Sequence, residues 1–332
     1  NIILLPSMDD ILQEDVRRAF DDLTGRKRII VIAGAGLGTS RGIPDFRSKT
    51  GLFGKSGGKD SFDITQVYRT KESTDHFYKL VQTMYQAPSE EIPSTYRFFK
   101  ALQDKGCLLR IYQQNIDGLD AKILGSDVDI PVEQPWKTVI RMHGDVSVAK
   151  CDTCHTKYPA FDPMRYSSTK DIPCDACSKQ RNVRASSNRR PMRDCAYQVG
   201  KLLPWVVMYN EYNPDLQAIS NCSIHDLNAK PDAIIVIGTT LRIRATHTLA
   251  RVLCPDVRNR ELPTFWISNE VPAKKDQSLF QHQLIMPCDT VSKLWLSWLN
   301  EHATIADSVS TESLAFGDNM SFLGNDCRYC SA

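Results

Sequence analysis

The chain has 332 residues, of which 42% are hydrophobic and 24% are charged, and its net charge is +2. These values exclude a collagen-like, coiled-coil or disordered polypeptide, and they leave no global field that would attract nucleic acid. No apolar run approaches the roughly 20 residues that a membrane span needs, and residues 1–6 lack the basic flank and cleavage site of a secretory signal. The composition predicts a water-soluble protein with two domains or one large one, and no membrane partner.

The predicted elements begin with an amphipathic helix over residues 12–23, which ends near Gly25. Unbroken apolar runs then predict strands that are buried on both faces of a parallel sheet. These runs are residues 28–33, 107–112, 233–237 and 264–268. Strands that alternate with helix-sized segments predict an α/β fold with a Rossmann-like doubly wound parallel sheet, whose ligands lie at the carboxyl ends of the strands.

Two insertions interrupt this pattern and predict a smaller domain. Residues 49–93 are rich in Gly, Ser, Lys, Tyr and Phe and predict a helical insertion, while residues 151–199 predict a metal-binding lobe. The Rossmann-like parts of the folded region 12–300 are then about 26–48, 94–150 and 200–300. From residue 301 to residue 332 the chain is polar and rich in serine, which predicts a tail.

A glycine-rich turn follows the first predicted strand. In Gly34-Ala35-Gly36-Leu37-Gly38-Thr39, two glycines stand at the tight turn, but Thr39 stands where a dinucleotide fingerprint has its third glycine. A glycine-rich turn without a ligand is the alternative at this point. Pro44 and the glycines of residues 51–58 break the second strand that a dehydrogenase needs, so simple hydride transfer is disfavoured.

The motif that comes next, Gly42-Ile43-Pro44-Asp45-Phe46-Arg47-Ser48, resembles the signature of the sirtuins, a family of NAD-dependent protein-lysine deacylases. The resemblance covers about residues 27–299. It recurs in order at Gln114-Asn115-Ile116-Asp117, at His143-Gly144, at two cysteine pairs, at Gly238-Thr239-Thr240-Leu241 and at Ser268-Asn269-Glu270. Two positions depart from the family pattern, since Gly38 and Thr240 each stand where many relatives carry a serine.

The resemblance implies that NAD is bound and consumed as a co-substrate. Backbone N–H groups of the glycine-rich turn would hold its pyrophosphate, Phe46 would cover the nicotinamide, and Asn115 and Asp117 would take the carboxamide. The residues expected to bind NAD are Gly34, Ala35, Gly36, Thr39, Asp45, Phe46, Arg47, Gln114, Asn115, Ile116, Asp117, Gly238, Thr239, Thr240, Asn269, Glu270 and Cys288. Without the other motifs, Asn115 and Asp117 would be read as polar caps at a strand end.

His143 is the general base that the resemblance implies. A lone histidine is more often a structural residue than a catalyst, and the chain has seven. Its place in the His-Gly pair favours catalysis, and an ordinary imidazole already titrates near neutral pH. The implied reaction transfers the acyl group of a lysine to ADP-ribose and releases nicotinamide.

Residues 206–211 are similar to the family's substrate groove, in which Val is followed by aromatic residues and Gly-Glu. The resemblance implies that Val207, Tyr209, Asn210 and Glu211 bind the acetyl-lysine protein, with the Val207 carbonyl accepting the substrate N–H and Tyr209 forming a wall of the lysine tunnel. Met208 and Asn210 depart from the family pattern, and Asn in place of Gly is expected to tighten the groove. A buried strand without a ligand is the alternative.

Eleven cysteines, an odd number with two close pairs, favour metal ligation in a reducing compartment over a disulfide framework. Cys151 and Cys154 form one C-x-x-C pair, and Cys174 and Cys177 form the other. This spacing predicts one structural zinc with four thiolate ligands and no open position. The pair at 327 and 330 has no second pair nearby and is read as incidental.

The stretch after the second cysteine pair is basic. It contains Lys179, Arg181, Arg184, Arg189, Arg190 and Arg193. Such a run is most often a solvated loop. The long insert looks like that of the fungal nuclear sirtuins that deacetylate nucleosomal histones, which implies a histone substrate, contact with nucleosomal DNA and a nuclear location. The alternatives are a sirtuin-like protein ADP-ribosyltransferase, a zinc-ribbon chromatin-binding module without turnover, and a silent NAD sensor.

Overall fold

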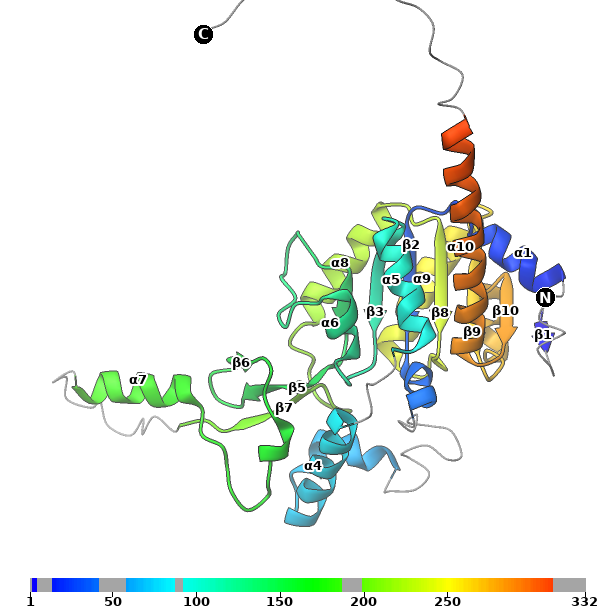
Figure 1. The fold of residues 1–332 in the computed structure, drawn as a ribbon. Helices are drawn as coiled ribbons and strands as arrows, with labels where there is room; N and C mark the ends of the chain where they lie inside the picture. Colours follow the sequence, from blue (N-terminus) through cyan, green and yellow to red (C-terminus); the bar gives the residue numbers. More distant parts are fainter. Residues whose placement is uncertain (1, 5–13, 42–57, 87–91, 187–198, 313–332) are drawn as a thin grey trace, which may run out of the picture.

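A computed structural model of the chain describes residues 2–4, 14–41, 58–86, 92–186 and 199–312. Figure 1 shows two parts, a larger one built around the labelled strands of a central sheet and a smaller one that contains α4, β5, β6 and β7. Three of the residues expected to bind NAD, Asp45, Phe46 and Arg47, lie outside the described residues.

The large sheet has seven strands, and every neighbouring pair in it is parallel. Its order is β1 (Ile2–Leu4), β10 (His282–Ile285), β9 (Thr264–Ser268), β8 (Ala233–Ile237), β2 (Ile29–Ala33), β3 (Leu108–Gln113) and β4 (Val139–Arg141). In chain order, β2, β3 and β4 extend to one side and β8, β9 and β10 to the other, which is the strand order of a Rossmann sheet. The order reverses between β2 and β8, so the crevice for a ligand is expected at the ends of these two strands.

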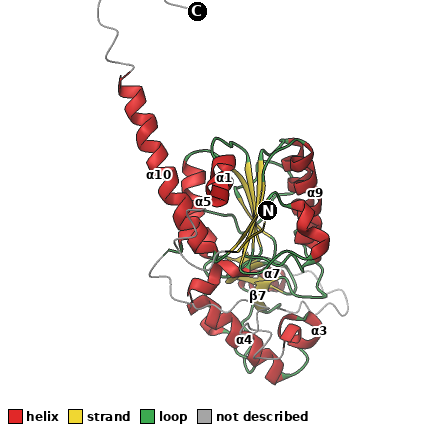
Figure 2. Cartoon of the chain, turned by 90° about the vertical axis from the view of Figure 1, so that its right-hand side faces the viewer, coloured by secondary structure: helices red, strands yellow, loops and turns green. Residues whose placement is uncertain are grey.

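Helices cover both faces of this sheet, which Figure 2 shows edge-on between α1, α5 and α10 on one side and α9 on the other. The first hydrophobic core joins the strands to α1 (Glu14–Leu23), α5 (Ser94–Asp104), α6 (Leu119–Leu124) and α10 (Cys288–Glu312). The second core joins them to α8 (Leu216–Asn228), α9 (Arg244–Asn259) and the 3-10 turn η5 (Lys274–Leu279). The apolar strands are therefore buried on both faces, as predicted.

A third hydrophobic core lies outside the Rossmann-like part. It joins η3 (Gly58–Phe62), α3 (Ile64–Val67) and α4 (Lys71–Gln86) to the antiparallel sheet of β6 (Lys157–Tyr158), β5 (Gly144–Cys151) and β7 (Leu202–Val206), with η4 (Pro163–Arg165) at its edge. Phe62 and Phe77 from the helical segment and Val146 and Cys151 from the sheet are all buried in this core. The two insertions thus form one smaller domain, and the predicted fold class is confirmed. The residue boundaries of the domains stay a prediction.

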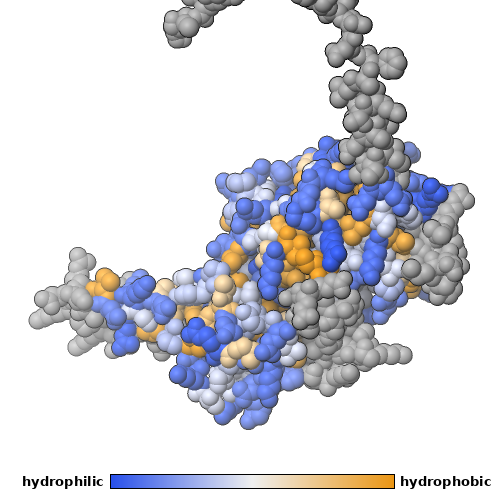
Figure 3. Space-filling view, viewed as in Figure 1, coloured by the Kyte–Doolittle hydropathy of each residue, from blue (hydrophilic) through white to orange (hydrophobic). Residues whose placement is uncertain are grey.

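Two segments differ from the expectation of loops. The first half of the basic stretch forms a helix, α7 (Asp175–Ser186), which projects from the smaller domain in Figure 1. Its residues 179–183 are all exposed, and Figure 3 shows hydrophilic and hydrophobic residues intermixed along this arm. The predicted tail begins inside α10, which continues to Glu312. Among the described residues, no helix is long and apolar enough to cross a membrane.

Candidate active site and metal centre

The glycine-rich turn after β2 packs directly against the turn after β8. The N–H groups of Gly34 and Gly36 donate to the carbonyl oxygens of Ile237 and Gly238, at 3.0 and 2.7 Å. A Cβ atom at Gly34 would lie 2.6 Å from the Cβ of Thr239, so a larger residue would push the two turns apart. Both glycines are required by this close approach. In this structure the two N–H groups donate to β8 and to the turn after it, and the binding of a pyrophosphate by the glycine-rich turn stays a prediction.

The turn continues as the 3-10 helix η2 (Ala35–Arg41), which contains Ala35 and Thr39. Across from it, the side chains of Gln114 and Thr239 are buried and joined by a hydrogen bond of 3.1 Å from Gln114 Nε2 to Thr239 Oγ1. Thr240 follows and is half-buried. Residues from β2, β3 and β8 therefore meet at the carboxyl edge of the sheet, where the strand order reverses.

Asn115 has a buried side chain whose polar atoms find no partner among the described residues. Its backbone N–H donates to Gln113 Oε1 at 3.1 Å, but among the described residues neither Oδ1 nor Nδ2 finds a hydrogen bond. Buried polar atoms are rarely left unpaired in folded proteins, because each lost hydrogen bond with water costs stability. An amide with both a donor and an acceptor free matches a carboxamide ligand, so this residue fits the nicotinamide end of NAD.

Ile116 and Asp117 complete the same loop. Ile116 is buried, and its carbonyl accepts the N–H of Val146 at 2.8 Å. Asp117 is half-buried and accepts the N–H of Leu119 at the start of α6. The loop is thus held by β5 and by α6 at the two residues that directly follow Asn115.

His143 lies next to this loop, between β4 and β5. Its Nδ1 is 3.2 Å from the carbonyl oxygen of Gln114, and the N–H of Met142 donates to Gln113 at 2.9 Å. Burial lowers the pKa of His143 below its ordinary value, and the hydrogen bond to Gln114 opposes that shift. The imidazole is therefore neutral at physiological pH, as a general base must be.

A buried charge network that the sequence analysis missed lies beside His143. The guanidinium of Arg141 contacts Asp120 at 3.2 Å and Asp145 at 2.5 Å, and all three side chains are almost fully buried. Burial raises the pKa of Asp120 to about 6, against the opposing effect of Arg141. The network ties the start of α6 to the residues on both sides of His143. An arginine inside the apolar sequence of a buried strand was the available signal, since such a charge needs a buried partner.

The remaining residues expected to bind NAD lie at the next strand of the same sheet edge. Asn269 and Glu270 directly follow β9, and both are exposed. Cys288 begins α10, is buried, and directs its thiol to the carbonyl of Ile267 at 3.8 Å. Burial raises the pKa of this thiol to about 12, so it stays protonated and unreactive.

The predicted substrate groove is joined to His143 through the backbone. The N–H of Val207 donates to the carbonyl of His143 at 2.9 Å, and no described residue donates to the Val207 carbonyl. Tyr209 is half-buried against the third core, and Asn210 and Glu211 follow in a turn. Asn210 has φ 61°, in the left-handed region that glycine and asparagine adopt most readily. Asparagine in place of the family's glycine is therefore compatible with the backbone conformation at position 210.

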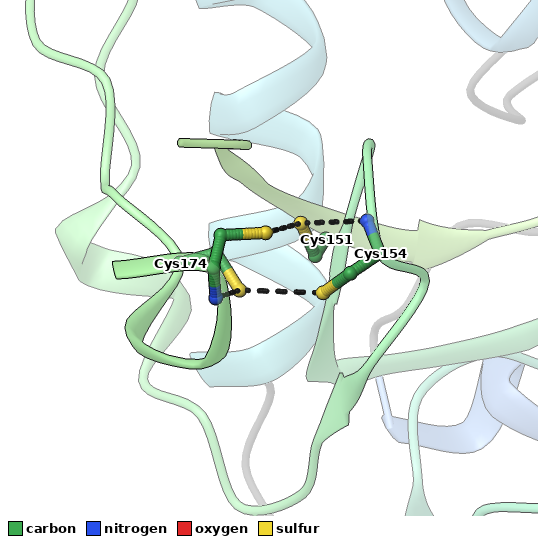
Figure 4. A group of neighbouring side chains, drawn as sticks. Cys151, Cys154 and Cys174 are labelled. Carbon is green, nitrogen blue, oxygen red and sulfur yellow. Dashed lines mark hydrogen bonds between the residues drawn. The ribbon is translucent and has the colours of Figure 1, made fainter. Parts of the chain in front are cut away.

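The four predicted zinc ligands form one cluster in the smaller domain, shown in Figure 4. The sulfur atoms of Cys151, Cys154, Cys174 and Cys177 all lie within 4.8 Å of one another. The two closest pairs are Cys154 with Cys174 at 3.6 Å and Cys151 with Cys177 at 3.7 Å. Four sulfurs bound tetrahedrally at about 2.3 Å from one zinc ion would be about 3.8 Å apart. The geometry and the thiol donors fit a structural zinc.

Comparison with known protein families matches residues 34–245 to the Sir2 family. Among curated proteins, the NAD-dependent protein deacetylase hst4 of Emericella nidulans is 33% identical over 285 residues, which are 82% of this chain and 47% of that protein. The NAD-dependent histone deacetylase HST4 of Saccharomyces cerevisiae is 31% identical over 262 residues, 75% of this chain and 69% of that protein. The chain therefore spans about half to two thirds of the length of these relatives.

Solved structures share the same fold. A mutant Sir2 homologue in complex with 2'-O-acetyl ADP ribose has a TM-score of 0.65 at 19% identity, covering 88% of this chain and 98% of that chain. A Sir2 protein with a deacetylated p53 peptide and 3'-O-acetyl ADP ribose has a TM-score of 0.57 at 21% identity, covering 84% of this chain and 96% of that chain. With the family match over most of the chain, the sheet order and the four-cysteine cluster, this protein belongs to the Sir2 family.

Proposed function

We propose that this protein is an NAD-dependent protein-lysine deacetylase that transfers the acetyl group to ADP-ribose and releases nicotinamide. The observation that carries the proposal is the position of His143, whose ring contacts the carbonyl of Gln114 and whose own carbonyl contacts Val207. The base therefore stands between the loop that carries Asn115 and the segment after β7 that is expected to bind the peptide. The names of the fungal relatives, which are NAD-dependent deacetylases, support this activity.

In this proposal each group of the site has one task. Bound NAD supplies an electrophilic ribose carbon and nicotinamide as the leaving group. Asn115 pairs with the carboxamide, because its donor and acceptor have no partner among the described residues and match that group, and Gln114, which is bonded to Thr239, contacts the ribose. His143 accepts a proton from a ribose hydroxyl at Nε2. The carbonyl of Val207, to which no residue in the described part of the chain donates, accepts the N–H of the substrate lysine.

The zinc has a structural task in this proposal. Four thiolates fill the coordination of a tetrahedral zinc ion, so no position is left for water or substrate. The cluster joins the end of β5, which contains Cys151, to the start of α7, which contains Cys177, and β5 begins directly after His143. Loss of the metal is therefore expected to disturb the site through β5 rather than through direct chemistry.

We further propose that the substrate is a histone and that the protein acts in the nucleus. The support is the naming of several relatives as histone deacetylases. Exposed Lys179 and Arg181 on α7 would contact the phosphates of nucleosomal DNA, since α7 projects from the smaller domain with no apolar stripe to bury. The other basic residues of this stretch lie where no side chain is described.

Mass spectrometry of an acetyl-lysine histone peptide, incubated with the protein with and without NAD, tests the activity. We expect loss of the acetyl group only with NAD, together with an acetylated ADP-ribose. Transfer of ADP-ribose to protein would indicate the transferase instead. NAD binding without any product would indicate a sensor, and nucleosome binding without NAD turnover would indicate a chromatin-binding module.

A further inference from the structure

The turn that carries Tyr209 is closed by its own hydrogen bonds. The N–H of Glu211 donates to the carbonyl of Met208 at 3.3 Å, which makes residues 208–211 a β-turn. Asn210 occupies the third position with φ 61°, where such turns require glycine or asparagine. The Glu211 carboxylate in return accepts the N–H of Met208 at 2.9 Å. Local chemistry therefore fixes the shape of the turn.

A second set of bonds fastens this turn to the helical segment of the smaller domain. The backbone of Tyr209 pairs with that segment on both sides, since its N–H donates to Phe62 at 2.8 Å and its carbonyl accepts the N–H of Ile64 at 3.1 Å. Between these two bonds, Nδ2 of Asn210 donates to Oδ2 of Asp63 at 2.6 Å. The wall of the predicted lysine tunnel is thus held by η3 and α3 and not only by β7.

Both carboxylate oxygens of Asp63 accept hydrogen bonds where the turn at Tyr209 meets α3. Its carboxylate is buried, with 7% of the residue exposed, and its Oδ1 accepts both the N–H and the hydroxyl of Thr65 at the start of α3. These bonds to Thr65, and after them the bond to Asn210, hold the pKa of Asp63 below its ordinary value. The carboxylate is therefore ionised and makes a charge-assisted bond to the amide of Asn210, which is stronger than a neutral one.

Glycine would satisfy the backbone at position 210 equally well, but it could not reach Asp63. Asparagine combines the left-handed backbone with a side chain that bridges two parts of the smaller domain. The backbone requirement alone therefore does not account for this residue. We therefore explain the Asn210 side chain by its bond to Asp63, which holds the neighbouring Tyr209 in place.

We infer that the bond between Asp63 and Asn210 positions the substrate wall, so that the groove is ordered before the acetyl-lysine peptide arrives. This inference rests on the proposed deacetylase function. A peptide that binds mainly through its backbone needs a rigid edge, because any segment that becomes ordered on binding weakens the affinity. The bond lies away from the β2 and β8 turns, so its loss should affect the peptide and leave the nucleotide alone.

The test compares Asn210→Gly and Asp63→Asn with a matched control, Asp60→Asn, which removes an exposed charge from the same 3-10 turn. Fluorescence anisotropy would measure the Kd of a labelled acetyl-lysine peptide, and calorimetry would measure the Kd of ADP-ribose. We expect Asn210→Gly and Asp63→Asn each to weaken peptide binding roughly tenfold, which is the loss of one charge-assisted hydrogen bond. ADP-ribose binding should stay unchanged in both, and Asp60→Asn should match the parent in both measurements.

Two further comparisons distinguish a result that contradicts the inference from one that contradicts the proposed function. The double variant should bind the peptide no more weakly than either single variant, because both remove the same bond. Asp63→Asn also alters the start of α3, so Asn210→Gly, which keeps the backbone conformation, is the decisive variant. If Asn210→Gly binds peptide like the parent, or loses ADP-ribose affinity equally, the inference is wrong. A parent protein that binds no acetyl-lysine peptide would overturn the proposed function itself, and with it the role of this bond.

Discussion

The Nδ1 atom of His143 lies 3.2 Å from the carbonyl oxygen of Gln114. A carbonyl can only accept a hydrogen bond, so Nδ1 must carry the proton, and the lone pair of the neutral ring is on Nε2. One backbone contact thereby sets both the tautomer and the direction of the base. It also couples the base to the loop that carries Asn115.

Replacing His143 with alanine should lower kcat by about 10² to 10⁴-fold, since a general base contributes about this much to the rate. Binding of ADP-ribose and the melting temperature should change little, because the ring is needed for proton transfer. His225→Gln, on α8, is the matched control and should leave the rate unchanged. Steady-state kinetics of peptide deacetylation would measure the effect, and a fully active His143→Ala variant would rule out the assigned role.

The pH dependence of kcat/KM should report the lowered pKa of His143. Burial disfavours the charged imidazole, so the group loses its proton at a lower pH than the ordinary value of about 6.5. Activity should therefore be constant through neutral pH and should decline only below about pH 6.5, as the ring takes up a proton. A pH–rate profile with an acid limb centred above pH 7 would contradict this description of the site.

Asn115 should lower the stability of the protein without NAD, because its amide is buried and has no hydrogen-bond partner in the part of the chain that the structure describes. Asn115→Leu is expected to raise the free energy of unfolding by about 1 kcal/mol, while abolishing turnover. Asn213→Leu is the control, since both of its amide atoms are hydrogen-bonded, to Met142 and Asp215, and it should destabilise the protein. Urea unfolding without NAD would compare the two, and equal losses of stability would show that the Asn115 amide is satisfied in solution.

One zinc ion per chain should be found by metal analysis. Cys174→Ser should remove the metal and unfold the smaller domain, because the binding energy of a structural zinc is also folding energy. Cys107→Ser, which changes a buried cysteine outside the cluster, should keep the metal. A metal-free preparation with full activity and an unchanged melting curve would be incompatible with the site.

Asp226 is buried on α8, against the face of the sheet opposite α5. Among the charged residues, it is the one whose replacement should lower the free energy of unfolding most. It accepts two hydrogen bonds from Arg110, at 2.8 and 2.9 Å, and one from the hydroxyl of Tyr112 at 2.7 Å. Asp226→Ala leaves the buried Arg110 charge unpaired, so a loss of about 3–5 kcal/mol is expected. Chemical denaturation would measure it. The double variant with Arg110→Met should recover part of the loss, and an unaffected single variant would contradict this account.

The central strands of the sheet could be predicted because each is a continuous apolar run with both faces buried. The segments 28–33, 107–112, 233–237 and 264–268 match β2, β3, β8 and β9 within one residue at each end. The strand β10, which lies between β1 and β9, was missed because it begins with two polar residues, His282 and Gln283, and His282 is paired with the distant Asp22. α7 was missed because its residues lack the spacing of an amphipathic helix.

The sequence motifs predicted which residues would belong to the site, but they did not predict the contacts between those residues. The four cysteines form the cluster that their spacing implied. The position of Asp63 next to Asn210, 147 residues away in sequence, depends on the packing of the helical insertion against the turn that follows β7, and no local pattern encodes it. For the same reason the sequence did not reveal that the N–H groups of Gly34 and Gly36 donate to β8 and to the turn after it. The roles of the individual residues in binding NAD and peptide stay predictions.

The stoichiometry of nicotinamide release against acetyl-lysine loss tests the central claim most directly. Both quantities would be measured in the same reaction by liquid chromatography and mass spectrometry, with limiting acetyl-lysine peptide and excess NAD. The deacetylase proposal predicts one nicotinamide released for each lysine freed, and none in the absence of peptide. Nicotinamide release that continues without peptide, or ADP-ribose attached to protein while the peptide stays acetylated, would contradict it.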